Sequence, residues 1–572
     1  MDESAQSQRL LLAAILSFAI LMGWYYVFPP KKTPPAGPAV AGQSEGTRGA
    51  TLAKSSTPAA VAASSTVSVP QDQPSVAIEH AEFTGSVAGP DPKKPMPFKL
   101  VLTNEGGGVE HFELPSYHER DSSNQATKEP IALSQAAGGA DLYEQMGALQ
   151  FEDASFSLPP RPVYEVAEKQ PGLVRYRYRA GGVEIEREYH VRPDSFEIEM
   201  AVSVRNRSAD PQHYRLAIGA AMTMRPELAS GGFLFMPPPD HMDGLCYSDG
   251  KVRRAAQKSL AKEAERFHEG VKWVAIDRQY FVAAIIQRDG VEATCELSGR
   301  GHAARAALSL PATTLGPGEE RRHKFTAYLG VKQPALLTQA DAQLEAAVDY
   351  TILGLNLALL CQGLLLILGL IHRLTASWGV AILGLTVIVK LILFPLNQRS
   401  GKSMRAMSAL KPEMDRIREK FPEDRQRQSE ELMKLYKQYG VNPASGCLPI
   451  LLQMPIWFAL YRALWVSIDL YQESFLWMPD LTARDPFWIL PVALVLVMFV
   501  QQKMTPSTMD PTQQKVMLYM MPLIFGATMA ALPAGLAFYI LVNSLLTIAQ
   551  QHFINRSIGP VAGPASAPGA TA

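Results

Sequence analysis

The stretch from Leu435 to Trp457, LYKQYGVNPASGCLPILLQMPIW, decides what kind of protein this chain forms. It joins a charged segment directly to a run that is apolar enough to enter a lipid bilayer. Pro443, Pro449 and Pro455 each remove a backbone hydrogen-bond donor and bend any helix that contains them. Because backbone groups inside a bilayer need partners within the protein, this series predicts a junction of defined shape at a membrane boundary.

Several apolar runs on either side of this junction indicate a multi-span membrane protein. The 572 residues are 47% hydrophobic and carry a formal net charge of zero, so the placement of charge matters more than its sum. The cysteines Cys246, Cys295, Cys361 and Cys447 lack the spacing of a metal site. Cys246 and Cys295 can pair only if their segment faces an oxidising compartment, and we expect unpaired thiols.

The first apolar run, Leu10 to Phe28, ends in the aromatic cluster Trp24-Tyr25-Tyr26, which suits a membrane interface. The alternative is a cleaved signal peptide. Its apolar core is too long for that role, and the small-residue site nearby lies too far downstream. We therefore predict a transmembrane anchor over residues 1–28 and a flexible Pro/Ala/Ser-rich linker over 29–75.

Residues 76–345 change to an alternation of apolar and polar side chains. Val174 to Arg179 alternates, Ala180-Gly181-Gly182 is a turn signal, and Val183 to Tyr189 alternates again. This pattern predicts a β-hairpin within a large antiparallel β-sandwich. The segment has no nucleophile elbow, HExxH motif or glycine-rich phosphate loop, so we predict a folding or docking module and no enzyme activity.

The topology of the membrane region follows from one charged loop. Residues 397–440 carry eleven Lys/Arg against seven Asp/Glu, and the positive-inside rule places them in the cytoplasm. If the β domain lies outside, one of the apolar runs Thr351–Leu374 and Ser377–Leu396 does not span. We assign residues 346–376 to an interfacial helix, because polar residues interrupt the first run. The charges that flank the N-terminal span mildly favour the opposite orientation.

The predicted fold is a multi-span α-helical membrane protein with about six spans and a large β-sandwich domain. The spans are Leu10–Phe28, Ser377–Leu396, Leu448–Ile468, Phe487–Val500, Val516–Leu532 and Leu536–Ala549. Residues 377–556 form the helical core with a cytoplasmic helical hairpin over 397–440. The uncharged tail over 557–572 is predicted to be disordered.

Polar residues in these spans, or just beyond the end of the sixth, gather between the midplane and the cytoplasmic side. They are Lys390, Thr386, Gln453, Asn543, Thr547 and Gln550. Thr386 and Lys390 lie four residues apart on one helix face, and the last three form an i, i+4, i+7 stripe. The outer halves of the spans are mostly apolar, with Arg462 as the exception. The pattern predicts a cavity open to the cytoplasm and closed toward the outside.

Lys390 is the strongest single indication of a groove. An ammonium inside a membrane costs on the order of 3 kcal/mol and usually faces protein or water. The alternative is that its long side chain reaches the cytoplasmic interface at Asn397-Gln398 without any role. We favour the groove because polar residues occur on the other spans as well.

The fifth span is crowded with methionines. Met517, Met520, Met521 and Met529 lie within it, and methionine adapts to irregular apolar shapes. The alternative is ordinary helix packing. The fourth and fifth spans are also shorter than the ~20 residues that a bilayer core requires, which predicts local thinning of the membrane.

The charged loop is predicted to form two antiparallel helices, Arg399 to Lys420 and Glu423 to Tyr439, around Phe421-Pro422. Its basic residues are candidates for contact with ribosomal RNA, a role that the uncharged tail cannot fill. The candidates are Arg416, Arg418, Lys420, Arg425 and Arg427. Acidic neighbours predict that this contact is weak.

Short motifs between Trp378 and Arg556 resemble a known family. They are Leu435-Tyr436-Lys437, Val441-Asn442-Pro443, Gly446-Cys447, Pro449, Gln453-Met454-Pro455, Asp485-Pro486, Gln502-Lys503-Met504, Asp510-Pro511 and Pro533-Ala534-Gly535-Leu536. The chain is similar to the YidC/Oxa/Alb family of membrane-protein insertases, in the Gram-negative form with a large periplasmic domain. The N-terminal half matches this form by architecture more than by motif.

The resemblance implies a five-helix core whose cytoplasm-open groove carries one basic residue, usually arginine, at the position of Lys390. Lysine keeps the charge and loses the bidentate fork of arginine. A polar segment of a nascent inner-membrane protein would enter the groove while its apolar segment slides into lipid past the third and fifth spans. The implied slide residues are Met454, Pro455, Met517, Met520 and Met521.

The resemblance also implies a multi-pass location in the cell inner membrane, with the large domain in the periplasm. The implied partners are nascent membrane proteins, the lipid bilayer, the ribosome, and the Sec translocon with its accessory subunits; no cofactor is implied. A small-solute transporter is the alternative, and it predicts paired half-repeats with polar residues on both sides of the midplane. A membrane-bound enzyme predicts a nucleophile with its base, or a metal cluster, at membrane depth.

Overall fold

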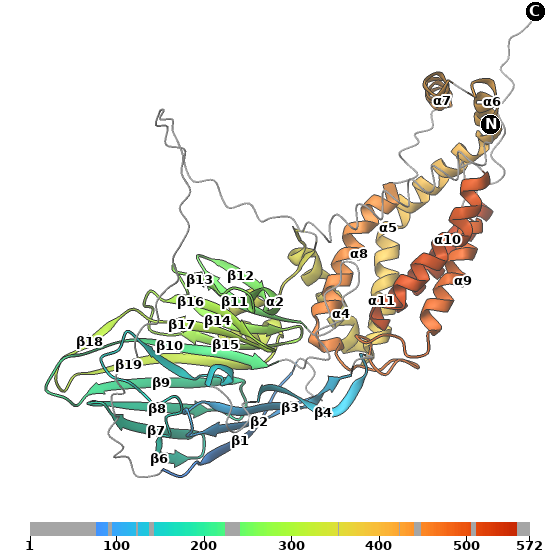
Figure 1. Ribbon diagram of the computed structural model, residues 1–572. Helices are drawn as coiled ribbons and strands as arrows, with labels where there is room; N and C mark the ends of the chain where they lie inside the picture. Colours follow the sequence, from blue (N-terminus) through green and yellow to red (C-terminus); the bar gives the residue numbers. More distant parts are fainter. Residues whose placement is uncertain are drawn as a thin grey trace, which may run out of the picture. The chain divides into compact units, whose positions relative to one another are not determined.

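The computed structural model describes residues 76–557 with the exception of 90–93, 122–123, 136–141, 224–240, 342, 353, 423, 440–447 and 505–510. The predicted anchor and linker, the tail beyond Ser557 and the junction residues 440–447 lie outside the described residues. The described part consists of a β-rich segment followed by long, largely apolar helices (Figure 1).

Three antiparallel sheets build the β domain. The four-stranded sheet has the order β1 (His80–Val87), β2 (Met96–Thr103), β3 (Val109–Arg120) and β4 (Ala126–Gln135). The nine-stranded sheet has the order β12 (Lys251–Ala256), β11 (Met242–Ser248), β14 (Trp273–Arg278), β15 (Phe281–Gln287), β19 (Glu320–Val331), β9 (Glu197–Asn206), β8 (Val183–Val191), β7 (Leu173–Ala180) and β6 (Glu165–Gln170). The six-stranded sheet has the order β13 (Glu265–Phe267), β16 (Thr294–Arg300), β17 (Ala303–Ser309), β10 (Gln212–Thr223) and β18 (Thr313–Leu315), with β5 (Leu149–Glu152) also paired to β10.

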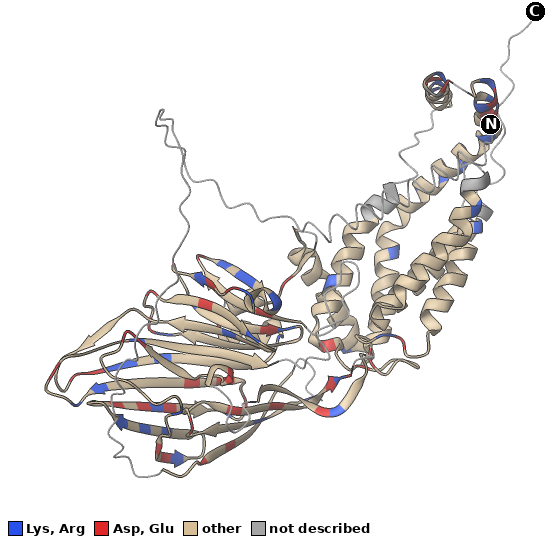
Figure 2. Ribbon diagram, in the orientation of Figure 1, with Lys and Arg blue, Asp and Glu red and all other residues tan. Residues whose placement is uncertain are grey.

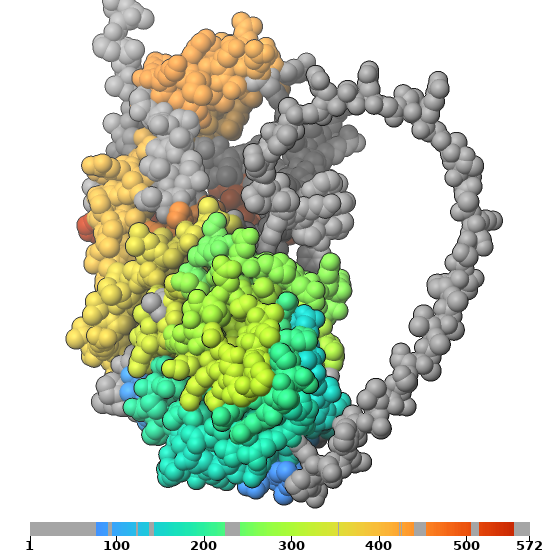
Figure 3. All heavy atoms as spheres, turned by 90° about the vertical axis from the view of Figure 1, so that its left-hand side faces the viewer, coloured from blue at the N-terminus to red at the C-terminus, as the bar shows by residue number. Residues whose placement is uncertain are grey.

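The two larger sheets face each other. Strand β10 packs against β14 and β15, and β17 packs against β14. Between the sheets lies an apolar core that includes the fully buried ring of Trp273. Cys246 and Cys295 are free thiols within this core. Segments that are distant in sequence thus form one packed body, as the teal, green and yellow-green atoms in Figure 3 show.

The hairpin of β7 and β8 confirms the alternation in the sequence. Val174, Tyr176 and Tyr178 are buried. The arginines between them point outward and lie opposite glutamates of β8, in the pairs Arg175–Glu188, Arg177–Glu186 and Arg179–Glu184. The connecting Gly181 and Gly182 have φ of 60° and 77°, a conformation that glycine adopts without steric penalty and that the tight hairpin turn requires.

Two short elements lie within the β domain, η1 (Leu142–Glu144) and α2 (Gln257–Leu260). Four more connect the β domain to the helices, and they are α3 (Pro334–Ala340), η3 (Leu344–Ala347) and the strands β20 (Thr351–Ile352) and β21 (Leu355–Asn356). The helices that follow are α4 (Ala358–Thr375), α5 (Trp378–Ala409), α6 (Lys411–Lys420), α7 (Arg425–Gln438), α8 (Leu448–Val466), α9 (Ile489–Met504), α10 (Pro511–Met529) and α11 (Ala534–Ser557), with η5 (Ile468–Leu470) after α8.

Helix α11 is central to the helical packing, since it contacts α5, α8 and α9. Helix α4 packs on α5 and α8. Within the described residues, Ala358–Thr375, Trp378–Ala409 and Ala534–Phe553 are long and apolar enough to cross a membrane, and Ile489–Met504 is a shorter apolar helix. Charged side chains are sparse on α8 to α11 and frequent on α6 and α7 (Figure 2). The assignment of α4 to the membrane interface rests on the odd number of crossings needed between the β domain and the charged loop, and it remains a prediction.

The charged loop differs from its predicted boundaries. Its first helix does not begin at Arg399, because α5 continues without interruption from Trp378 to Ala409. Residues 402–409 are mostly good helix formers, and the single Gly401 costs only about 1 kcal/mol within a helix. The break falls at Leu410, where Pro412 occupies the first turn of α6, a position that tolerates the missing N–H.

Candidate functional site

The site begins with one contact between α5 and α11. Lys390 lies near the middle of α5, and its Nζ donates a hydrogen bond to Oγ1 of Thr547 at 2.8 Å. The Thr547 hydroxyl in turn donates to the backbone oxygen of Asn543 at 2.7 Å. Within the described part of the chain, Lys390 has no carboxylate in ion-pair range. Its positive charge is therefore positioned by neutral groups and remains available to an anionic partner.

The stripe on α11 contains polar atoms that lack protein partners. The Asn543 Oδ1 and Gln550 Nε2 atoms are buried and make no hydrogen bond to any described residue. Leaving such an atom unpaired costs about 1–3 kcal/mol. Water or a bound chain must therefore supply their partners. The hydrogen bond between Lys390 and Thr547 joins α5 to this stripe, and Lys390, Asn543, Thr547 and Gln550 are hereafter called the α5–α11 polar face.

Two predicted residues lie elsewhere. Thr386 is fully buried, and its hydroxyl donates to the backbone oxygen of Ile382 one turn earlier at 2.7 Å. It is therefore a packing residue of α5 and does not reach an open surface, contrary to the prediction. Gln453 on α8 directs Nε2 toward the hydroxyl of Tyr539 on α11 at 3.5 Å. This contact links α8 to α11 and is separate from Lys390.

The predicted slide residues lie on two helices and are mostly exposed. Met454 and Pro455 are exposed on α8, and Met520 and Met521 are exposed on α10. Met517 is half-buried. Exposed methionine on an apolar helix offers an adaptable surface to lipid or to another apolar segment.

In the charged hairpin, α6 packs on α7 through the buried side chains Leu410, Met414 and Leu435. Arg416 pairs with Glu413 at 3.0 Å and Arg418 with Asp415 at 3.3 Å, each within one turn. These exposed pairs contribute little to stability, typically below about 1 kcal/mol.

The remaining candidates lie around the turn of the hairpin. Lys420 and Arg427 lie over the ring of Phe421, at 5.6 and 5.4 Å from its centroid. Arg425 begins α7, and its side chain is outside the described residues. The predicted basic residues are thus gathered on one hairpin, where two of them already have acidic partners.

Sequence reasoning missed the contacts between the β domain and the loop that joins α8 to α9. Arg120 at the end of β3 donates from Nη2 to Asp480 Oδ2 at 2.7 Å and also to the hydroxyl of Thr482. All three side chains are buried. The neighbouring Glu119 accepts from Arg278 of β14 at 3.0 Å. No local signal identifies these pairs, because Arg120 and Asp480 are 360 positions apart.

Arg462, the polar exception in the outer half of its span, also has a structural partner. Its Nη2 lies 2.8 Å from Asp349 Oδ2, and its Nε donates to the Asp349 backbone oxygen at 2.8 Å. Burial alone would raise the pKa of Asp349, but the charge of Arg462, the hydrogen bonds from Thr351 and the charge of Arg254 together lower that pKa. The pair ties α8 to the segment just before α4.

Comparisons with known proteins agree with this architecture. The family model of the 60Kd inner membrane protein matches residues 370–560, and that of the YidC periplasmic domain matches residues 97–359. A membrane protein insertase YidC of Anaeromyxobacter dehalogenans (strain 2CP-C) is 34% identical over 96% of this chain and 97% of its own length. The membrane protein insertase YidC of Geobacter metallireducens is 31% identical over 96% of this chain and 98% of its own length.

Among solved structures, an active YidC insertase with its first transmembrane domain resolved aligns with 80% of this chain and 90% of its own, at 21% identity and a TM-score of 0.36. The assignment rests on the sequence relatives, whose match extends over both halves of the chain. None of these relatives supports the transporter alternative, and the family consists of insertases and not of enzymes. The chain belongs to the YidC family of membrane protein insertases, inner-membrane proteins with a large periplasmic domain.

Proposed function

We propose that this chain inserts nascent inner-membrane proteins into the bilayer by way of the α5–α11 polar face, which is open to the cytoplasm. Two observations support this proposal: the hydrogen bond from Lys390 to Thr547, and the buried atoms of Asn543 and Gln550 that lack a partner among the described residues. A polar segment of the substrate supplies partners for these atoms, and its carboxylates are attracted by the Lys390 ammonium. Because Lys390 is half-buried, this attraction is stronger than at a fully exposed surface.

The apolar part of the substrate leaves by a different surface. Met454 and Pro455 on α8 and Met520 and Met521 on α10 are exposed and apolar. A hydrophobic segment that moves along them passes from the polar face into lipid. Burial of apolar surface, at about 25 cal/mol per Å², drives this transfer, so the step needs neither a nucleotide nor a covalent intermediate.

The orientation follows from charge. Helices α6 and α7 lie in the cytoplasm as the basic hairpin, and the β domain lies in the periplasm, in a multi-pass chain whose α4 rests at the outer interface. In this orientation the hairpin meets the ribosome, and the spans meet the Sec translocon and its accessory subunits laterally when the two act together.

Reconstitution tests the proposal. The purified protein is placed in liposomes of bacterial lipid composition, and a single-span substrate with a short acidic translocated tail is synthesised in their presence. We expect the substrate to become protease-protected and resistant to alkaline extraction only in liposomes that contain the protein. Equal protection in protein-free liposomes, or none with the correctly folded protein, would refute the proposal.

A further inference from the structure

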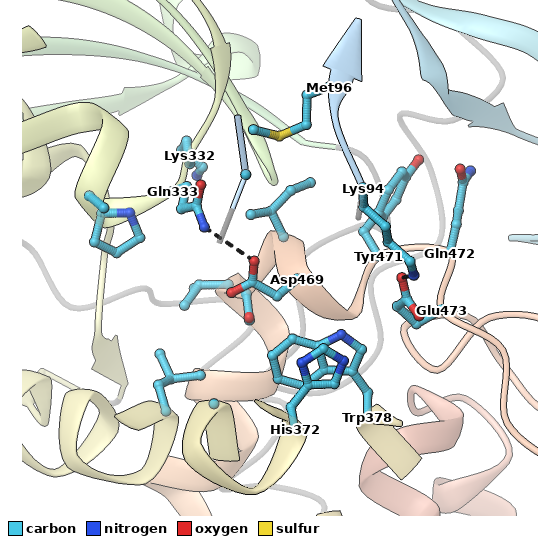
Figure 4. Close-up of a pocket in the computed structure, with 18 of the residues that line it drawn as sticks. Lys94, Met96, Lys332, Gln333, His372, Trp378, Asp469, Tyr471, Gln472 and Glu473 are labelled. Carbon is cyan, nitrogen blue, oxygen red and sulfur yellow. Dashed lines mark hydrogen bonds and ion pairs between the residues drawn. The ribbon is translucent and has the colours of Figure 1, made fainter. Parts of the chain in front are cut away.

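A cavity of about 790 Å³ lies where the β domain meets α4 and the loop after α8. Its lining includes Tyr117 of β3, Gln333 next to α3, His372 of α4, Trp378 of α5 and Asp469 of η5. Figure 4 shows Gln333, His372, Trp378 and Asp469 reaching the cavity from separate elements. Neither the α5–α11 polar face nor the slide residues contribute to it.

Asp469 is the carboxylate in this lining without a cationic partner. Gln333 Nε2 approaches its Oδ1 at 3.4 Å, and no lysine or arginine in the described residues forms an ion pair with it. Two lysines of the lining already have acidic partners, since Lys94 pairs with Glu473 and Lys332 with Asp277. A partly buried carboxylate without an ion-pair partner favours a cation from outside the chain.

Aromatic side chains line the same cavity as this carboxylate. Tyr117, Tyr350 and Tyr471 line the cavity, and Trp378 stacks on His372 with ring centroids 3.9 Å apart. Burial, followed by the charge of Asp469, raises the pKa of the Tyr117 hydroxyl. Burial and the neighbouring Glu473 raise the pKa of Asp469 itself to about 6, so it is mainly ionised at neutral pH. A carboxylate among aromatic faces is the environment that binds an alkylammonium group.

The floor of the cavity is apolar and continues onto the outer surface of α4. Leu366 lines the cavity and is 66% exposed. Leu359, Leu370 and Leu374 lie on the same helix face and are exposed as well. Arg373, also exposed, belongs to the lining one residue after His372. The ligand that fits carries an ammonium, an anionic group and an apolar chain.

We propose that this cavity binds the headgroup of a zwitterionic aminophospholipid, with its ammonium at Asp469, its phosphate near Arg373 and its acyl chains along the exposed leucines of α4. A basic side chain of a translocated substrate segment satisfies the carboxylate equally well but leaves Arg373 and the leucines unused. The lipid therefore accounts for more of the lining. The site lies apart from the insertion surface, and its occupancy can be measured without any substrate.

The test uses the purified full-length protein and native mass spectrometry. We expect phosphatidylethanolamine to be retained about tenfold more strongly than phosphatidylglycerol, which has no ammonium. Asp469→Asn, which keeps an acceptor for Gln333, should abolish this preference. Asp194→Asn, an exposed position in the turn between β8 and β9, is the matched control and should preserve it.

A second measurement does not depend on any variant. Phosphatidylethanolamine with a photoreactive group on its acyl chain should label peptides of α4 in the native protein, and unlabelled phosphatidylethanolamine should reduce that labelling. The proposal is overturned by equal retention of the two lipids, by an unchanged preference in the Asp469→Asn protein, or by labelling that avoids α4. Displacement of the lipid from α4 by a lysine-containing peptide but not by phosphatidylethanolamine would assign the cavity to substrate instead.

Discussion

Lys390 on α5 donates a hydrogen bond to Thr547 on α11 at 2.8 Å, although the two residues are 157 positions apart. The contact fixes the direction of the ammonium from the facing helix and leaves its charge without a carboxylate among the described residues. A lysine free to extend along its own helix toward the interface would not need this partner. The geometry therefore supports a functional charge over simple extension to the membrane surface.

The first prediction concerns that charge. Lys390→Glu should abolish insertion of substrates with acidic tails, because it replaces attraction by repulsion, whereas Lys390→Arg should be tolerated. Insertion is measured as protease protection at equal protein level. Lys251→Glu, at an exposed position at the start of β12 in the β domain, makes the same charge change away from the polar face and should retain activity. Equal insertion by the Lys390→Glu protein would rule out the role of this charge.

The second prediction concerns Arg120 and Asp480. Arg120→Ala leaves a buried carboxylate without its partner, which typically costs about 3–5 kcal/mol. Hydrogen exchange should accelerate in the loop between α8 and α9, with little change in the β7–β8 hairpin. The double variant Arg120→Ala/Asp480→Asn should recover part of the protection. If the single variant exchanges like the native protein, this pair does not hold the loop.

The third prediction concerns the β domain as a whole. Deletion of residues 76–330 should leave insertion largely intact, since the proposed groove and slide lie entirely on the helices. The deletion also removes Arg120, the ion-pair partner of the buried Asp480 carboxylate. It should therefore be combined with Asp480→Asn. Loss of insertion in a variant whose helices remain folded would show that the domain belongs to the mechanism.

The fourth prediction concerns topology. In a chain without native cysteines, Leu374→Cys and Leu476→Cys should react with a membrane-impermeant thiol reagent from the periplasmic side, and Arg418→Cys should not. Leu476 is chosen because it is 70% exposed in the loop after α8, while Asp480 in the same loop is buried. Periplasmic labelling at Arg418 would mean that α4 spans the membrane and that the polar face opens to the other side.

The fifth prediction concerns the ribosome. Replacing Arg416, Arg418, Lys420, Arg425 and Arg427 by Gln should weaken co-sedimentation with ribosomes and flatten its salt dependence, because phosphate contacts are lost. Removal of residues 557–572 should have no effect, since that segment carries no charge. The effect should be modest, because Arg416 and Arg418 already pair with acidic neighbours. If removal of residues 557–572 weakens co-sedimentation and the Gln replacements do not, the ribosome contact lies in the tail.

Local patterns in the sequence determined the elements of this protein. The alternation from Val174 to Tyr189 specified the β7–β8 hairpin, because the face of each side chain in a strand follows from its position, and glycine permitted the turn. The spacing of Asn543, Thr547 and Gln550 likewise specified one face of α11. Motifs confined to a few residues were enough to indicate the family.

Only the tertiary structure decided which of these faces have partners. Thr386 and Lys390 share a helix face by spacing, yet the first is buried against its neighbours and the second reaches Thr547. Arg120 meets Asp480 across 360 positions, and Asp469 faces a cavity whose walls come from distant elements. Periodicity specifies the direction of a side chain relative to its own helix or strand. Burial and pairing depend on the element packed opposite, which no local pattern in the chain encodes.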